Sequence, residues 1–153
     1  RREPVDATNV PRELSGVRTM FNCFHHLPPR LARAVLQDAV SKRQPIAIFE
    51  GLSHRGIGVA FVALQIPAMF LLTPFIRPVR WSRFALTYLL PLIPGLVAFD
   101  GTMSMLRLYL GDELHELVRS LDGYETFEWD IGTTRASHLP VGVAHLVGVP
   151  RIS

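Results

Sequence analysis

Two long runs without a charged residue are the feature that most constrains the fold of this chain. Residues 57–76 ("IGVAFVALQIPAMFLLTPFI") and residues 84–99 ("FALTYLLPLIPGLVAF") contain no Asp, Glu, Lys or Arg. Twenty residues of α-helix, at about 1.5 Å each, reach roughly 30 Å, the thickness of a bilayer's hydrocarbon layer. The second run is shorter, and Pro91 and Pro94 near its middle interrupt a helix. The sequence therefore predicts a hydrophobic helical insertion.

The segment between the runs, "RPVRWSR", indicates how the insertion meets a membrane. If both runs spanned the bilayer, the flanking segments would share the cytoplasm, and Arg77, Arg80 and Arg83 would lie outside. Such an orientation opposes the positive-inside tendency. We therefore expect a hairpin on the cytoplasmic leaflet, with these arginines at anionic headgroups and Trp81 at the interface. The alternative is a hydrophobic cap buried over a site or in a dimer.

Charge and cysteine content exclude some classes of protein. The 153 residues carry a formal net charge of +3, mostly from arginine, because Lys42 is the only lysine. This excess is too small to predict a nucleic-acid partner, but it leaves anionic lipid or a charged cofactor open. The single cysteine, Cys23, excludes an internal disulfide and a CxxC metal pair.

The chain before the runs has the pattern of a strand, a helix and a second strand. Residues 17–24 are apolar and rich in strand formers, and residues 28–43 have helical periodicity. Residues 44–51 form a short apolar run, as expected of a strand covered on both faces in a parallel sheet. The expected apolar stripe of the helix consists of Leu31, Val35, Ala39 and Val40. This order predicts a βαβ unit.

After the runs the pattern is again that of a soluble domain. Residues 111–121 predict a helix with one apolar face. Residues 125–135 and 141–150 predict two strands joined by a loop that contains His138 and Pro140. The apolar face of the helix consists of Leu114, Leu117, Val118 and Leu121.

Three motifs, in this order, resemble the C-terminal half of a class I S-adenosylmethionine-dependent methyltransferase. The loop Val5–Pro11 ("VDATNVP") resembles the family's segment after its third strand. Phe24–Leu27 ("FHHL") resembles the end of its fourth strand, and Ile46–Glu50 ("IAIFE") resembles its fifth. The resemblance implies an α/β fold with a partial doubly wound, Rossmann-like sheet that ends in an antiparallel pair.

The expected organisation has three parts. Residues 1–56 would hold the fourth strand, a helix and the fifth strand, and residues 57–106 would be the inserted helical hairpin. Residues 107–153 would hold the last helix and the strand pair, and Tyr109 would re-enter the domain near the site.

The resemblance also implies S-adenosylmethionine as cofactor. Asp6 would accept a hydrogen bond from the adenine amine, and the Ala7 N–H would donate to a ring nitrogen. Ligands of open α/β sheets lie beyond the carboxyl ends of the strands. This rule places Cys23 and Phe24 beside the methionine part of the cofactor.

His25 and His26 follow at the same strand end, where an imidazole could accept the proton of a methyl acceptor near neutral pH. The residues also admit structural roles. One histidine could pack under the sheet while the other caps the next helix. Asp6 could be a turn residue, and Glu50 a solvated carboxylate at a strand end.

The chain lacks two parts of the family's cofactor site, the glycine-rich loop after the first strand and the acid after the second. We therefore expect a fragment or a truncated product that binds the cofactor poorly by itself. No HExxH spacing indicates zinc, and no GxSxG elbow indicates a hydrolase. Cys23 beside His25 is better explained as inert strand packing than as a nucleophile.

The sequence therefore predicts a methyltransferase-like protein that acts on an apolar or lipid-like acceptor at the cytoplasmic side of a membrane. Two alternatives stay open. One is a membrane-associated remnant without catalysis, and the other is a small integral membrane protein whose α/β likeness is accidental.

Overall fold

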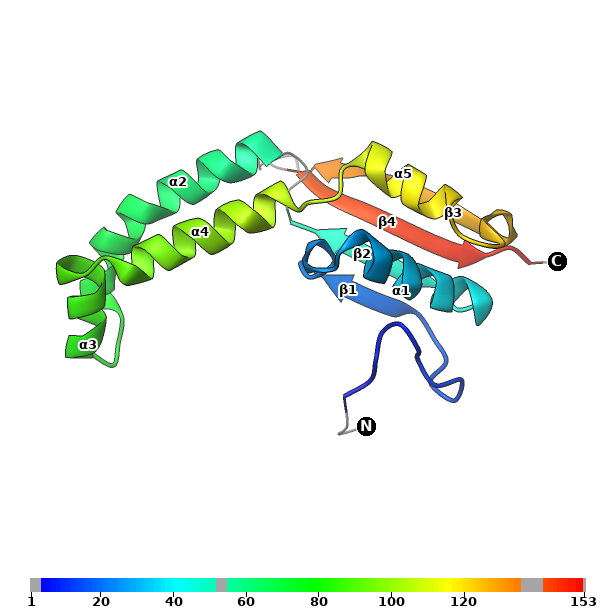
Figure 1. The fold of residues 1–153 in the computed structure, drawn as a ribbon, viewed down its shortest axis with the longest axis horizontal. Coiled ribbons are helices and arrows are strands. Elements are labelled where there is room, and N and C mark those ends of the chain that lie inside the picture. The colour runs from blue at the N-terminus through cyan, green and yellow to red at the C-terminus, as the bar shows by residue number, and fades with distance from the viewer. Residues whose placement is uncertain (1–3, 52–54, 136–141, 153) are drawn as a thin grey trace. The chain divides into compact units, whose positions relative to one another are not determined.

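A computed structural model describes residues 4–51, 55–135 and 142–152. The chain forms two compact units (Figure 1). The first, called the α/β unit below, comprises Arg1–Ser53 and Leu108–Ser153. The second, called the helical hairpin, comprises His54–Arg107. The helical hairpin therefore contains both charge-free runs, residues 57–76 and 84–99.

The α/β unit contains a mixed sheet of four strands in the order β1-β2-β4-β3. These strands are β1 (Arg18–Phe21), β2 (Ile46–Glu50), β3 (Phe127–Arg135) and β4 (Gly142–Pro150). β1 and β2 are parallel, whereas β4 is antiparallel to both β2 and β3. The predicted βαβ unit and the predicted antiparallel pair are therefore confirmed.

The first strand ends earlier than the sequence predicts. Residues 17–24 were expected to be extended, but β1 stops at Phe21 and Asn22 has a φ of 49°. This left-handed conformation turns the chain out of the sheet. Phe24–His26 then form a 3₁₀ turn, η1. The two histidines therefore lie in a turn beyond the strand rather than on it.

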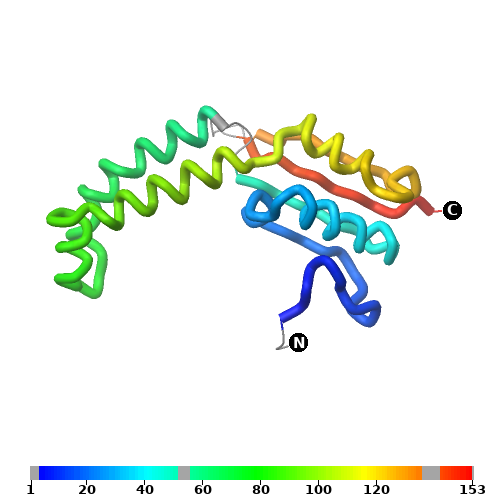
Figure 2. The backbone as a smooth tube through the Cα atoms, in the orientation of Figure 1, coloured from blue at the N-terminus to red at the C-terminus, as the bar shows by residue number. Residues whose placement is uncertain are grey.

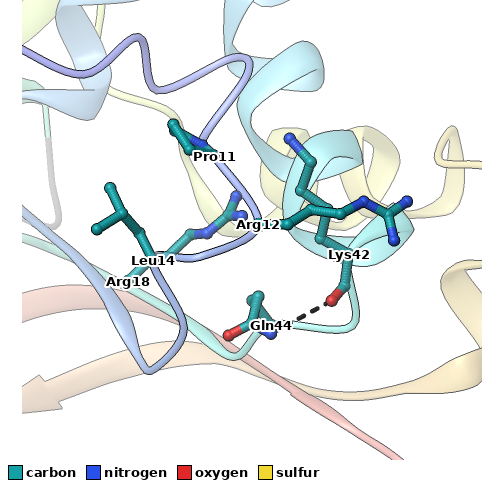
Figure 3. Close-up of a pocket in the computed structure, with 6 residues that line it drawn as sticks. All are labelled: Pro11, Arg12, Leu14, Arg18, Lys42 and Gln44. Carbon is teal, nitrogen blue, oxygen red and sulfur yellow. Dashed lines mark hydrogen bonds between the residues drawn. The ribbon is translucent and has the colours of Figure 1, made fainter.

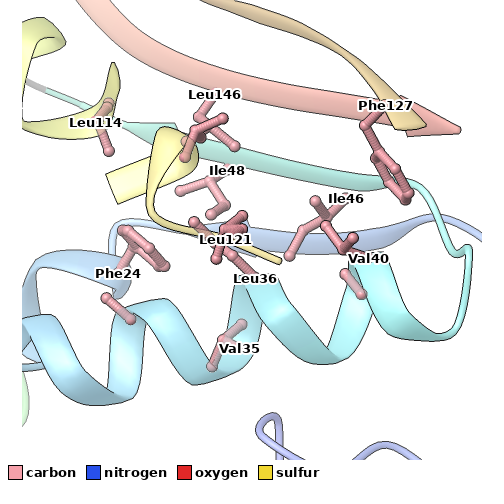
Figure 4. Close-up of a cluster of buried hydrophobic side chains, with 13 residues drawn as sticks. Phe24, Val35, Leu36, Val40, Ile46, Ile48, Leu114, Leu121, Phe127 and Leu146 are labelled. Atoms are coloured by element: carbon pink, nitrogen blue, oxygen red, sulfur yellow. The ribbon is translucent and has the colours of Figure 1, made fainter. Parts of the chain in front are cut away.

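Helices α1 (Pro29–Ser41) and α5 (Gly111–Arg119) cover one face of the sheet. Pro29 occupies the first turn of α1, where its missing N–H costs no hydrogen bond. The buried core between these helices and the sheet consists of Phe24, Ala32, Val35, Leu36, Ala39, Val40, Ile46, Ile48, Leu114, Val118, Leu121, Phe127 and Leu146 (Figure 4). Both predicted helices therefore bury an apolar face in one core.

The prediction for one residue of the apolar stripe on α1 is wrong. Leu31 is 43% exposed. The buried stripe instead begins at Ala32 and continues through Val35, Leu36 and Ala39, at intervals of three, four and seven residues. Leu31 lies one position earlier, about 100° around the helix. The stripe on α5 is confirmed, with Leu117 at its half-buried edge.

No helix among the described residues of the α/β unit covers the other face of the sheet. Phe21 is 64% exposed there, and its ring stacks on Phe49 at 5.4 Å. Phe49 pairs with His145 on β4. The loop with His138 and Pro140 lies outside the described residues.

The charge-free runs form a helical hairpin (Figure 2). Its elements are α2 (Arg55–Leu72), η2 (Thr73–Phe75), α3 (Trp81–Phe84), the π-helix η3 (Ala85–Leu89) and α4 (Leu92–Leu106). The long arms α2 and α4 pack together and run in opposite directions. The second run is broken, as its prolines predict, because η3 ends before Pro91 and α4 begins after it.

Glycines allow the two arms to approach closely. A Cβ atom on Gly101 would lie 2.9 Å from Cγ2 of Val62, and one on Gly58 would overlap the Met105 side chain. Small residues at helix contacts have this effect in membrane and soluble proteins alike.

By length and composition, one helical stretch of the described chain, Gly56–Phe75, could cross a membrane. The stretches Trp81–Leu89 and Leu92–Leu106 would qualify only as a pair, across a bend of 71°.

Candidate functional site

A buried carboxylate organises the carboxyl ends of the parallel strands. Glu50, the last residue of β2, accepts a hydrogen bond from the backbone N–H of Phe24 at 2.8 Å. Its other oxygen lies 2.6 Å from Nδ1 of His25. The side chains of His25 and Glu50 are each 8% exposed. A single side chain of β2 therefore holds the turn that follows β1.

The contact with Glu50 decides which nitrogen of His25 is free. A carboxylate only accepts hydrogen bonds, so Nδ1 of the neutral ring carries the proton. Nε2 then keeps its lone pair and can accept a proton. A carboxylate that orients an imidazole in this way also stabilises the cation that forms when Nε2 is protonated. The pair therefore has the arrangement of a general base.

Three neighbours surround this pair. The ring of His26 lies 4.2 Å from that of His25 and is exposed. Cys23 is half-buried. Asn22 accepts a hydrogen bond from the Gly51 N–H at 2.6 Å, which joins the ends of β1 and β2 a second time.

The side chain of Phe24 belongs to the hydrophobic core. Its ring is 1% exposed and lies 5.4 Å from that of Tyr109. The Tyr109 hydroxyl donates to the carbonyl of Leu27 at 2.6 Å, so Tyr109 returns beside the turn as expected. Burial, with the negative charge of Glu113, raises the pKa of the Tyr109 hydroxyl.

Asp6 forms a turn, the structural role that the sequence left open. Its Oδ1 accepts hydrogen bonds from the Thr8 N–H and hydroxyl, both at 2.8 Å. These bonds lower the pKa of the Asp6 carboxyl. Among the described residues, no hydrogen-bond partner is present for its Oδ2 or for the Ala7 N–H. The two groups that adenine would need are therefore open.

Three arginines of the hairpin lie in the segment that joins α2 to α4. Arg77 and Arg80 are exposed, and Arg83 donates to the carbonyl of Ile76 at 2.9 Å. Trp81 is 83% exposed. Positive charge and an exposed indole therefore gather in one short segment between two apolar arms.

Sequence reasoning missed the partnership of Glu50 with His25. The available signal was a carboxylate at the end of a strand whose parallel neighbour ends near histidines. It missed a second polar cluster as well, around Asp38 of α1. Asp38 accepts hydrogen bonds from Arg18 Nη1 at 2.7 Å, from Lys42 and from the Val10 N–H at 3.2 Å.

The pKa of Asp38 reflects two opposing effects. Burial raises it, but the hydrogen bonds from Lys42, Arg18 and Val10 outweigh burial, so the pKa lies below the ordinary 3.8. The cluster joins the N-terminal loop, the start of β1 and the end of α1.

Metal binding finds no support in the described part of the chain, which contains no group of three or more His, Cys, Asp or Glu able to hold an ion.

Comparisons with family models, with curated proteins and with solved structures find no match to this chain.

The Glu50→Gln variant tests the orientation of His25. The amide can still accept from the Phe24 N–H, but its NH₂ group would then donate to Nδ1 of His25. We expect the neutral ring to change from the Nδ1–H to the Nε2–H tautomer, as measured by ¹⁵N chemical shifts of the imidazole. His115, exposed on α5, is the internal control. An unchanged tautomer of His25 would contradict the pairing.

The Asp38→Asn variant tests the second cluster. At neutral pH we expect a loss of about 2–3 kcal/mol in the free energy of unfolding, because Arg18 and Lys42 lose a partly buried partner. The folded-state pKa of Asp38 is lowered, so its stabilisation is present above pH 3.8 and is lost as the pH falls through the folded-state pKa.

Urea unfolding at a series of pH values, followed by Trp129 fluorescence in a Trp81→Phe background, measures both effects. Asp122→Asn is the matched control, because the Asp122 side chain is 89% exposed. If Asp38→Asn retains the acid-dependent loss of the parent, Asp38 is not its source.

Proposed function

We propose that this chain is the acceptor-side half of a methyltransferase-like domain at the cytoplasmic surface of a membrane. It would direct methyl transfer from S-adenosylmethionine to an apolar or lipid-like acceptor, with His25 as the base. The observation that carries this proposal is the contact of 2.6 Å between His25 and Glu50 at the carboxyl ends of two parallel strands. Ligands of open α/β sheets bind at this edge.

The sheet supports a doubly wound, Rossmann-like domain as the frame of the site. β1, α1 and β2 form a parallel unit of the kind from which such domains are built. The exposed stack of Phe21 on Phe49 lies on the face that a second layer of helices covers in doubly wound domains.

The residues present fit the adenine end of the cofactor. Asp6 Oδ2 would accept from the exocyclic amine, and the Ala7 N–H would donate to the ring nitrogen. Cys23, half-buried beyond β1, would line the methionine side. When bound, the cofactor supplies an electrophilic methyl group on a sulfonium sulfur.

His25 and its neighbours handle the acceptor's proton. Nε2 of His25 takes the proton from an O–H or N–H of the acceptor as that atom becomes the nucleophile. Glu50 stabilises the resulting imidazolium. His26, exposed with its ring 4.2 Å from that of His25, returns the proton to water.

The hairpin would supply the contact with a membrane that contains a lipid-like acceptor. Large apolar side chains are exposed along and around α2, including Phe61, Leu64 and Leu71, and this helix has no polar face. A helix apolar on all sides is stable in hydrocarbon or within a protein core. Arg77, Arg80 and Arg83 at the turn suit anionic headgroups.

One observation favours the remnant without catalysis as a second candidate. The Asp6 carboxylate already closes its own turn with Thr8, which is a sufficient structural reason for an Asp at this position. In that case the α/β unit would be a scaffold attached to the hairpin.

A methyl-transfer assay tests the function. The assay uses membranes from cells that express the reading frame encoding this chain. With S-adenosylmethionine labelled in its methyl group, His25→Gln should lower label incorporation about 100-fold, the lower range for loss of a general base. Cofactor binding should be unchanged. His115→Gln on α5 is the control. Equal incorporation by parent and His25→Gln would remove His25 from catalysis, and no incorporation by the parent would favour the remnant.

Vesicle flotation tests the membrane contact. We expect binding to require anionic lipid, to weaken with salt, and to fall roughly 100-fold when Arg77, Arg80 and Arg83 are all replaced by Gln, at about 1 kcal/mol each. The matched control replaces Arg30, Arg119 and Arg135 of the α/β unit by Gln, which removes the same charge. If the variant with Gln at positions 77, 80 and 83 stays bound at high salt, the hairpin spans the bilayer. A parent that binds no vesicles would indicate a buried cap.

A further inference from the structure

A basic cavity lies at the end of the sheet opposite to Glu50 and His25. It has a volume of about 150 Å³ and is lined by Pro11, Arg12, Leu14, Arg18, Lys42 and Gln44 (Figure 3). Arg18 is the first residue of β1, and Lys42 and Gln44 lie between the end of α1 and the start of β2. The cavity is therefore at the amino ends of the parallel strands, and the proposed methyl-transfer site at their carboxyl ends does not include it.

The lining of the cavity is positively charged. Arg12, Arg18 and Lys42 contribute three cations, and the lining contains no carboxylate. The nearby Asp38 accepts hydrogen bonds from both Arg18 and Lys42, and so balances one of these charges. Arg12 makes no hydrogen bond or ion pair within the described part of the chain. An excess of positive charge therefore faces the cavity.

Arg18 has two buried donors without an acceptor. Its Nη1 donates to Asp38 at 2.7 Å, whereas Nε and Nη2 make no hydrogen bond and are shielded from solvent. These two nitrogens share one edge of the guanidinium group, and that edge binds two oxygens of one oxyanion. Leaving buried donors unpaired is unfavourable. One acceptor group with two oxygens would satisfy both donors at once.

The hydrogen bonds of two other lining residues, Lys42 and Gln44, are already made within the protein, so these residues contribute charge or support rather than further donors. Lys42 already donates to Asn9, Val10 and Asp38, so it contributes charge and no further donor. Gln44 accepts from the Gly16 N–H at 2.9 Å and donates to the Lys42 carbonyl, and so holds the wall. Arg12 and Leu14 of the other wall are exposed, and a ligand would have to displace part of this wall to reach the shielded edge of Arg18.

We propose that this cavity binds one phosphate group. Two of its oxygens accept hydrogen bonds from Nε and Nη2 of Arg18, Arg12 provides a second contact, and Lys42 provides charge. The group belongs either to a soluble phosphate ester or to a lipid headgroup, since both present the same tetrahedral oxyanion. This site is independent of the methyl-transfer proposal.

Titration calorimetry of the full chain in a zwitterionic detergent tests the site with inorganic phosphate, and with chloride at equal ionic strength as the reference. Arg18→Lys keeps the positive charge beside Asp38 but loses the two-nitrogen edge, so phosphate affinity should fall about tenfold or more. Arg12→Gln should weaken binding about threefold, and Arg119→Gln, which removes an exposed charge on α5, should not change it.

A second measurement does not depend on the folding of a variant. In the parent, the Nε–H signal of Arg18 in a ¹⁵N–¹H spectrum should shift on saturation with phosphate and not with chloride. Absence of saturable phosphate binding, an unmoved Arg18 signal, or equal losses in Arg18→Lys and Arg119→Gln would each overturn the proposal.

Vesicles distinguish the two sources of the phosphate group. In a background with Arg77, Arg80 and Arg83 replaced by Gln, vesicles that contain phosphatidic acid are compared with vesicles that contain phosphatidylserine at equal charge. A lipid source predicts that Arg18→Lys weakens binding to phosphatidic acid alone. A soluble source predicts no effect on either vesicle and a loss of inorganic phosphate binding only.

Discussion

The rest of the α/β unit depends on where the carboxylate of Glu50 directs its two oxygens. One oxygen accepts the Phe24 N–H and the other contacts His25 Nδ1, so a residue of β2 fixes the backbone and the side chain of the turn after β1. A buried carboxylate is stable only with such partners. This turn, η1, sets where α1 begins, and it places the Phe24 ring in the core. The proposed site and the stability of this edge would therefore depend on one residue.

The two units divide the chain's physical chemistry between them. The α/β unit buries its apolar residues in one core and gathers buried polar groups in clusters around Glu50 and Asp38. The helical hairpin has the opposite character: its arms expose apolar side chains, and its charged residues, besides the arginines of the turn, are Arg55, Asp100 and Arg107. Exposed apolar surface of this extent usually marks a surface that another partner or an apolar phase covers.

Much of the secondary structure could be predicted, because it follows from local periodicity and charge. The alternation of strand and helix, the stripe on α5 and the break before α4 are local signals, and each is confirmed. The pairing of Glu50 with His25 could not be predicted, since it joins residues on different strands and depends on register. The left-handed Asn22 that ends β1 was equally hidden, because many residue types end strands. The exposed Leu31 shows that periodicity predicts the spacing of buried residues along a helix, but not which residues around the helix are buried.

The position of the hairpin in the chain also shapes how the α/β unit folds. β2 precedes the hairpin and β4 follows it, yet the two strands are neighbours, with Ile46 opposite Gly148. Their pairing closes a loop that contains the whole hairpin, and loop closure is costly for a flexible chain. A hairpin that forms early from its own local contacts shortens the flexible part of that loop. An insertion that folds during synthesis, before β4 has emerged, would then shorten the stretch of flexible chain across which β4 must pair with β2.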